Sequence, residues 1–298
     1  MNTTANTVNS PLTGKAARKI QSFEAVSIVD HYSRDYGIDI SRFFHEIKEI
    51  SVYECTDTHY RFYYPFSLSA DEKVYDQLQE FSWYYVQQKW DFGQALSYVK
   101  PGDSVLEVGC GNGNFLEKLV IAGAKGIGLE LNRKAIDEAR RKQLVIEQEV
   151  VEHFAQHTQE KFDVVCAFHL LEHIWNVKDF IDACIACLKP GGHLLFTVPN
   201  HDFMGQPYNP LDKPPHHMGL WGRKAFKGIE KAFPIRLTHV HYSHPKPEAR
   251  PILVNELSRK LARLPPVLRS MSRFAGTCYP FVPKRYKADV IMAVFTRR

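Results

Sequence analysis

The sequence has few of the features that mark membrane-spanning and secreted proteins. None of its apolar runs approaches the roughly 20 residues that a helix needs to cross a bilayer, and the N-terminal stretch lacks the hydrophobic core of a signal peptide. We therefore expect a globular cytoplasmic protein. With 298 residues and 44% hydrophobic content, the chain can bury a substantial core.

Cysteine is also scarce, and the six cysteines are scattered. Most lie inside apolar stretches, so we expect them to be reduced and buried. Cys184 and Cys187 form a C-x-x-C, but no second pair follows at zinc spacing, and the pair falls on an apolar helix face. We predict core packing for this pair and no metal in the protein.

A strong basic character is missing as well, since the net charge is only +5. This balance permits an acidic substrate, but the basic residues are dispersed until the C-terminal part of the chain. There is no N-P-P-Y or D-P-P-Y phrase and no basic stripe with interleaved aromatics. We therefore expect no nucleic-acid partner.

The most informative stretch is 103–119, which reads DSVLEVGCGNGNFLEKL. A short apolar run passes through three glycines into apolar residues at helical spacing, which predicts a strand, a tight turn and a helix. Glycines allow a backbone to approach a ligand closely and to take positive φ. Glu107 stands just before the turn, where a carboxylate can reach a ligand in the crevice of an open α/β sheet.

The glycine spacing separates two kinds of nucleotide site. A dinucleotide fingerprint, G-x-G-x-x-G, would need glycine where Asn114 stands. The G-x-G-x-G with an acid two residues before it resembles motif I of class I S-adenosylmethionine (SAM) dependent methyltransferases. This resemblance implies that Glu107 and the turn, namely Gly109, Cys110, Gly111 and Gly113, bind SAM.

The next predicted strand, 126–131, ends in Glu130 and Leu131. A carboxylate there is placed to accept both ribose hydroxyls, although an acid ahead of a helix N-terminus is an alternative interpretation. A third strand is expected at 144–148, and the resemblance implies that Gln148 or Glu149 faces adenine.

Two later segments extend the resemblance. The stretch 162–180, FDVVCAFHLLEHIWNVKDF, is similar to motif II and its following loop, which implies that Phe168 and His169 face the sulfonium. The stretch 188–200, LKPGGHLLFTVPN, is similar to motif III. The resemblance covers about residues 96–245 and the final strand.

The predicted fold is α/β, a Rossmann-like, seven-stranded, mostly parallel sheet with helices on both faces. The sixth and seventh strands are expected at 234–243 and 289–298, around a basic, Pro-rich insertion at 246–287. Within it, 252–273 predicts a basic amphipathic helix that either covers the sheet or lies on a membrane.

An N-terminal extension precedes this domain. We expect residues 1–20 to be disordered, 30–50 helical, 50–66 strand-like and 71–96 helical, with 21–95 forming an aromatic-rich unit. Most of its aromatic residues should pack onto the core, while one or two tyrosines line a substrate pocket.

Four histidines fall at predicted strand ends or in loops: His169, His173, His216 and His217. The last two belong to a PPHH-x-x-x-W segment, which is similar to one found in a bacterial branch of these enzymes. We take His216 or His217 as the preferred base, His169 as a further candidate and His173 as structural. A metal held by His216, His217 and a carboxylate is an alternative.

The sequence thus predicts a SAM-dependent O-methyltransferase that acts on a small molecule or a glycan precursor with a histidine base. An N- or C-methyltransferase of a small metabolite is the nearest alternative. A non-catalytic scaffold protein is a third, although such a protein would not need Glu107 and Glu130 at strand ends. The acceptor and the oligomeric state do not follow from the sequence.

Overall fold

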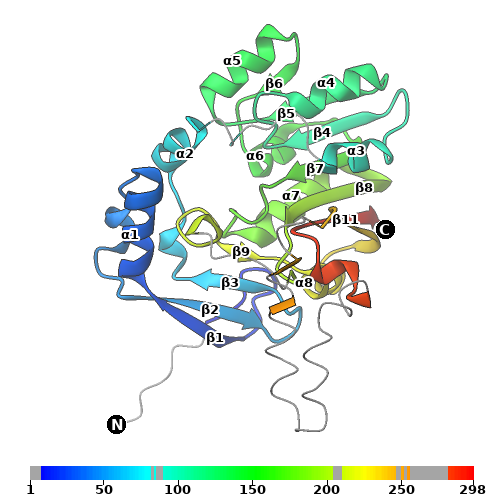
Figure 1. Cartoon of the computed structure of the whole chain (residues 1–298). Helices are drawn as coiled ribbons and strands as arrows, with labels where there is room; N and C mark the ends of the chain where they lie inside the picture. Colours follow the sequence, from blue (N-terminus) through cyan, green and yellow to red (C-terminus); the bar gives the residue numbers. More distant parts are fainter. Residues whose placement is uncertain are drawn as a thin grey trace.

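A computed structural model gives the fold of the chain (Figure 1). It describes residues 8–81, 84, 90–203, 210–245, 250–251, 254–255 and 281–298. Among these residues, no helix is long and apolar enough to cross a membrane.

The larger of two sheets has seven strands in the order β10-β11-β8-β7-β4-β5-β6. Only β11 runs antiparallel to its neighbours, so the predicted mostly parallel sheet is confirmed. The strands are β4 (Ser104–Val108), β5 (Lys125–Leu129), β6 (Val145–Glu147), β7 (Phe162–Phe168), β8 (Leu188–Pro199), β10 (Ile235–Tyr242) and β11 (Val290–Arg297). The chain leaves β4 towards β6 and returns to β7, which opens a ligand crevice beside β4.

Helices cover both faces of this sheet, as predicted. Alternate residues of β4 point to opposite faces, so that Val105 and Leu106 join different apolar clusters. One cluster includes residues of α3 (Trp90–Leu96), α4 (Asn114–Ile121) and α5 (Arg133–Arg141), and the other includes residues of α6 (Val151–His157), α7 (Val177–Cys187) and α8 (Arg223–Ile229). Cys184 and Cys187 belong to the second cluster and are free thiols, which confirms their predicted packing role.

The smaller sheet is antiparallel, with the order β1-β2-β3-β9, and lies below the larger sheet in Figure 1. Its strands are β1 (Ala17–Glu24), β2 (Glu49–Cys55), β3 (Arg61–Tyr64) and β9 (Gly219–Leu220). Helices α1 (Ala25–Tyr36) and α2 (Glu72–Gln79) flank it, together with short 3-10 turns at Ser41–Phe44, Phe66–Leu68 and Pro210–Asp212. A third apolar cluster joins this unit.

Two expectations for the N-terminal region need correction. The predicted disorder over 1–20 is wrong for the described part, because residues 8–20 are ordered and β1 begins at Ala17 and pairs along β2. The predicted helix over 30–50 is also too long. Gly37 takes the left-handed conformation at φ 67° and ends α1, and β2 begins at Glu49.

Strand β9 brings the PPHH segment to the N-terminal extension. The register pairs Phe62 with Gly219, so the chain just after the two histidines becomes the last strand of the small sheet. The small sheet therefore contains strands from both sides of the predicted domain boundary at residue 95. The predicted amphipathic helix at 252–273 lies almost entirely outside the described residues.

Candidate functional site

One cavity of about 1140 Å³ opens at the carboxyl ends of β4, β5 and β7 and extends to α2 and the loop before β9. All the predicted site residues except Gly113 line it. The cavity therefore brings together, on one surface, the glycine turn, Glu130 and the histidines of the PPHH segment.

The glycine turn has the backbone that its sequence demands. Gly109 and Gly111 lie at φ 72° and 53°. A Cβ on Gly109 would lie 2.9 Å from Cδ2 of Leu170, so a side chain there would meet both backbone strain and a packed neighbour. The backbone amides of Gly109 and Cys110 donate to the carbonyl of Leu129, which fastens the turn to β5.

Gly113 has a packing role. It caps the N-terminus of α4 at φ 79°, and a Cβ on it would lie 2.4 Å from Cδ1 of Leu144. Gly113 thus lets α4 approach the segment before β6, whereas Gly109 and Gly111 face the cavity.

Glu130 is the most firmly positioned carboxylate of the cavity. Its Oε2 accepts from the amide of Gly111, and its Oε1 accepts from the amides of Leu131 and Asn132, each at 2.8 Å. These bonds hold an acceptor-only group between the glycine turn and the end of β5. Such a group suits a ligand that presents paired hydroxyls.

The remaining predicted cofactor residues surround this point. Glu107 is 3% exposed on β4, and the ring of Phe168 packs against those of Phe92 and Phe115. The side-chain amide of Gln148 donates to the carbonyl of Leu131. Glu149 accepts from His153 and His157 on α6.

His169 lies between two buried acids. Its Nε2 is 3.4 Å from Oδ2 of Asp91 on α3, and its Nδ1 is 3.6 Å from Oε1 of Glu172. Burial alone lowers the pKa of His169, but the two acids outweigh it and raise the pKa to about 9. The imidazole is therefore protonated at neutral pH, which makes it the weakest of the three candidate bases.

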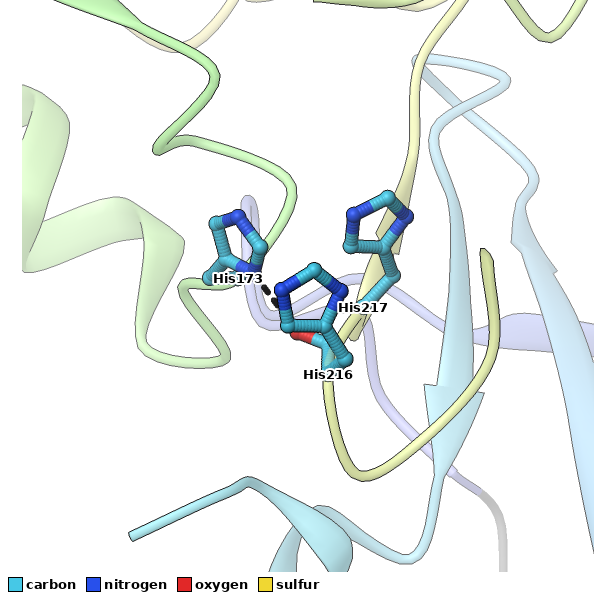
Figure 2. Close-up of side chains that lie close together, drawn as sticks. All are labelled: His173, His216 and His217. Atoms are coloured by element: carbon cyan, nitrogen blue, oxygen red, sulfur yellow. Dashed lines mark hydrogen bonds between the residues drawn. The ribbon is translucent and has the colours of Figure 1, made fainter. Parts of the chain in front are cut away.

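Three other histidines that line the cavity form a cluster, drawn in Figure 2: His173, His216 and His217. The ring centroid of His173 lies 4.4 Å from that of His216 and 4.8 Å from that of His217. The Nδ1–H of His173 donates to the carbonyl of His216 at 2.7 Å, and Nδ1 of His217 lies 3.6 Å from Oδ1 of Asp212. His173, predicted to be structural, thus lies beside both preferred bases.

The N-terminal extension holds the histidine loop in place. The hydroxyl of Tyr63 donates to the carbonyl of Asp212, and the amide of Ala70 donates to the carbonyl of Pro215. On the other side, the carbonyl of Glu172 accepts from the amides of Met218 and Gly219. The loop after β7 and the PPHH segment are therefore fastened to one another.

Burial keeps the paired histidines neutral. His216 and His217 are each 7% exposed, and burial, followed by the neighbouring histidines, lowers the pKa of both rings well below the usual value. A neutral imidazole has a free lone pair, so both rings can accept a proton or bind a metal.

Sequence reasoning missed several residues of this site. Tyr75 on α2 and Tyr84 line the cavity beside His216, which agrees with the expectation that one or two tyrosines of the extension would do so without the sequence having indicated which. Asp91 could have been found as the one acid of a mostly apolar helix, and Asp212 as the acid just before the PPHH segment.

The described residues that line the cavity are strongly acidic. Arg133 is the one arginine or lysine among them. The acids are Glu72, Asp76, Glu107, Glu130, Glu149, Glu152, Glu172 and Asp212. The cavity therefore favours neutral or cationic ligands over anions.

Comparison with known proteins agrees with this arrangement. Residues 82–250 match the family model described as a methyltransferase domain. The ubiquinone biosynthesis O-methyltransferases of Vibrio atlanticus and Cronobacter sakazakii are 33% and 35% identical to the chain over 108 residues. These alignments cover 34% of this chain and 46% and 44% of the relatives, so the chain matches less than half of their length.

A solved structure has the same fold. The SAM-dependent methyltransferase from Archaeoglobus fulgidus superposes with a TM-score of 0.56 at 17% identity, over 76% of this chain and 100% of that one. The family model spans more than half of the chain, and the solved structure shares its fold. The chain therefore belongs to the methyltransferase domain family and has the class I SAM-dependent fold.

Proposed function

We propose that the chain is a SAM-dependent O-methyltransferase that methylates a hydroxyl group of a small molecule or a glycan precursor. The observation that carries this proposal is the single cavity that joins the glycine turn and Glu130 to the buried histidines. One part of its wall has the groups that suit SAM, and another part has neutral bases.

The residues present fit SAM. Glu130 offers a carboxylate fixed by three backbone amides. At Gly109 the absence of a side chain leaves backbone exposed to the cavity, where a Cβ would collide with Leu170. When bound, SAM would supply an electrophilic methyl group on a sulfonium; an in-line nucleophile attacks the methyl carbon, and S-adenosylhomocysteine leaves. The work of the protein is mainly to align the acceptor, an effect worth up to about 7–11 kcal/mol.

His217 is our candidate for the base. Its Nδ1 faces Asp212, which favours the tautomer with Nε2 free to accept a proton and stabilises the imidazolium that follows. Its ring is neutral at neutral pH because burial lowers its pKa. His216 is the second candidate, since its Nδ1–H donates to the carbonyl of Leu211.

The cavity wall also supports a class of acceptor. Tyr75 and Tyr84 line it beside the histidine cluster, and Trp175 lines it as well. Such rings suit the flat face of an aromatic or sugar ring. The relatives named as ubiquinone biosynthesis O-methyltransferases are consistent with a ring hydroxyl as acceptor. The acidic lining favours an uncharged acceptor, and it also makes a cationic amine, and hence N-methylation, the second candidate.

The test is a screen with SAM labelled in its methyl group. Phenols, neutral sugars and amines are offered as acceptors, and transfer to a hydroxyl is the expected outcome. His217→Gln should lower turnover by about 10²- to 10⁴-fold, the usual contribution of a general base, while binding of S-adenosylhomocysteine is kept. Transfer only to amines would favour N-methylation.

A scaffold protein is tested separately by thermal unfolding. Saturating S-adenosylhomocysteine should raise the melting temperature, because a ligand that binds only the folded state stabilises it. If neither SAM nor S-adenosylhomocysteine shifts the melting temperature, the enzyme proposal fails.

A further inference from the structure

We propose that His173, His216 and His217 form a binding site for one divalent transition-metal ion, with zinc as the best match. The sequence predicted no metal and kept His216, His217 and a carboxylate as an alternative ligand set, whereas His173, 43 residues before His216, was assigned a structural role. The fold brings the three rings together.

The distances are compatible with a shared ion. One ring nitrogen from each histidine lies within 4.8 Å of those of the other two. Nitrogens bound tetrahedrally to zinc at about 2.05 Å lie about 3.4 Å apart, so a small rotation of the rings closes the site. Figure 2 shows that His173 approaches from the loop after β7, and His216 and His217 from the loop before β9.

The outer nitrogens of the three rings are oriented as metal-binding histidines require. Each Nδ1 faces an oxygen: the carbonyl of His216 for His173, the carbonyl of Leu211 for His216, and the carboxylate of Asp212 for His217. Ligand histidines typically donate their other nitrogen to such groups, which fixes the ring and leaves Nε2 as the ligand atom.

A buried nitrogen without a partner is the second observation that points to a ligand. Nε2 of His216 is enclosed, and no polar atom of the described residues hydrogen-bonds to it. Leaving a buried polar atom unsatisfied is costly, and a bound cation would remove that cost.

The donor set selects the class of ion. Three imidazole nitrogens suit zinc, cobalt, nickel or copper, whereas magnesium and calcium prefer oxygen ligands. All three histidines line the cavity, so a fourth position on the ion would face the acceptor. This resembles an open catalytic site more than a closed structural one.

A second group of possible ligands, Glu149, His153 and His157, is less suitable. Its two histidines are exposed, and Glu149 already accepts a hydrogen bond from both. This group therefore provides a matched control.

The role of the ion, though not its binding, rests on the proposed function. An acceptor hydroxyl bound to the ion would have a lowered pKa and would release its proton to water. The oxygen then forms a bond to the methyl carbon as the carbon–sulfur bond breaks, with S-adenosylhomocysteine as the leaving group. In the metal-bound protein, release of the acceptor's proton to water would replace its transfer to His217.

Cobalt(II) binding tests the site without SAM or acceptor. The full chain, stripped with a chelator, is titrated with Co²⁺, and visible absorption bands of a four- or five-coordinate ion should grow to one equivalent and disappear on adding Zn²⁺. His173→Ala and His216→Ala should each weaken Co²⁺ binding by about 100-fold or more. His153→Ala combined with His157→Ala should leave the titration unchanged.

Stabilisation by S-adenosylhomocysteine shows whether each variant is folded. If His216→Ala is unstable, His173→Gln is used, which keeps a polar side chain but removes the imidazole. Absence of Co²⁺ binding at millimolar concentration, or binding that survives both single variants, would overturn the site. Full methyl transfer by protein free of metal would overturn the role of the ion and leave His217 as the base, whereas loss of S-adenosylhomocysteine binding would count against the proposed function alone.

Discussion

Nδ1 of His217 lies 3.6 Å from Oδ1 of Asp212, and the two side chains are only 9% and 19% exposed. A carboxylate in this position orients the ring and stabilises its protonated form. Asp212→Asn should therefore lower kcat by about 10²-fold, while the KM for SAM stays unchanged, because the residue lies at the histidine end of the cavity. Steady-state kinetics measures both constants.

Asp57→Asn is the control for that variant. Asp57 is 40% exposed and pairs with Lys231 away from the cavity, so its loss should leave kcat unaltered. Equal rates for Asp212→Asn and the unaltered protein would show that the pair has no part in proton transfer.

Glu130 should control the affinity for the cofactor. Glu130→Gln keeps the shape of the side chain but removes its charge, and a hydrogen bond to a charged group contributes about 1.5–3 kcal/mol. Binding of S-adenosylhomocysteine should weaken about 10- to 100-fold in isothermal titration calorimetry. Glu147→Gln, an exposed acid on β6 that does not line the cavity, should bind normally. Equal affinities in both variants would refute the ribose assignment.

The cofactor end was predictable because its signals are local. Glu107, the glycine turn and Glu130 lie at the ends of strands that alternate with helices, and parallel strands bring their carboxyl ends together. Strand β1 was missed for the opposite reason. Its residues are mostly exposed, and the strand forms by pairing with β2, which lies about 30 residues later in the sequence.

The acceptor end depends on contacts that no short stretch of sequence contains. His173 meets the PPHH pair because β9 joins β3 and the carbonyl of Glu172 accepts from the chain just after His217. Asp91 meets His169 only because α3 packs against the end of β7. The histidines were recognised as candidates, but their partners came from tertiary structure.

Substitutions at Gly113 and Gly191 distinguish the energetic cost of a steric clash from the cost of backbone strain. Both have positive φ, at 79° and 74°, but a Cβ would meet Leu144 at 2.4 Å in the first case and nothing within 4 Å in the second. Gly191→Ala should cost about 1–2 kcal/mol of the free energy of unfolding, and Gly113→Ala about 1–3 kcal/mol more. Urea denaturation measures both. Equal losses would mean that Leu144 moves aside freely.

The charge of the acceptor should matter strongly. Because Arg133 is the one arginine or lysine among the described lining residues, adding a carboxylate to an accepted phenol should lower kcat/KM at least about 10-fold at low salt. Glu72→Gln removes one negative charge from the cavity wall and should therefore reduce the difference in kcat/KM between the neutral and the anionic acceptor. A faster reaction with the anionic acceptor would contradict the assignment of a neutral substrate.

His169 should make the stability of the protein depend on pH. Its pKa is raised to about 9, above the unfolded value near 6.5, because the effect of Asp91 and Glu172 exceeds that of burial. A group whose pKa is raised on folding stabilises the folded state fully below its unfolded pKa. That contribution is lost as the pH rises through the folded value. The free energy of unfolding should therefore fall by up to about 3 kcal/mol between pH 6.5 and pH 9.5.

Urea denaturation across this pH range compares the unaltered chain with His169→Gln. The variant cannot bind the proton, so it should lack this fall and should be less stable than the unaltered chain at pH 6.5, where Asp91 and Glu172 lose their cationic partner. His45→Gln provides the control, because the side chain of His45 is exposed and does not line the cavity. An equal slope in the unaltered chain and His169→Gln would show that His169 is not held protonated between the two acids.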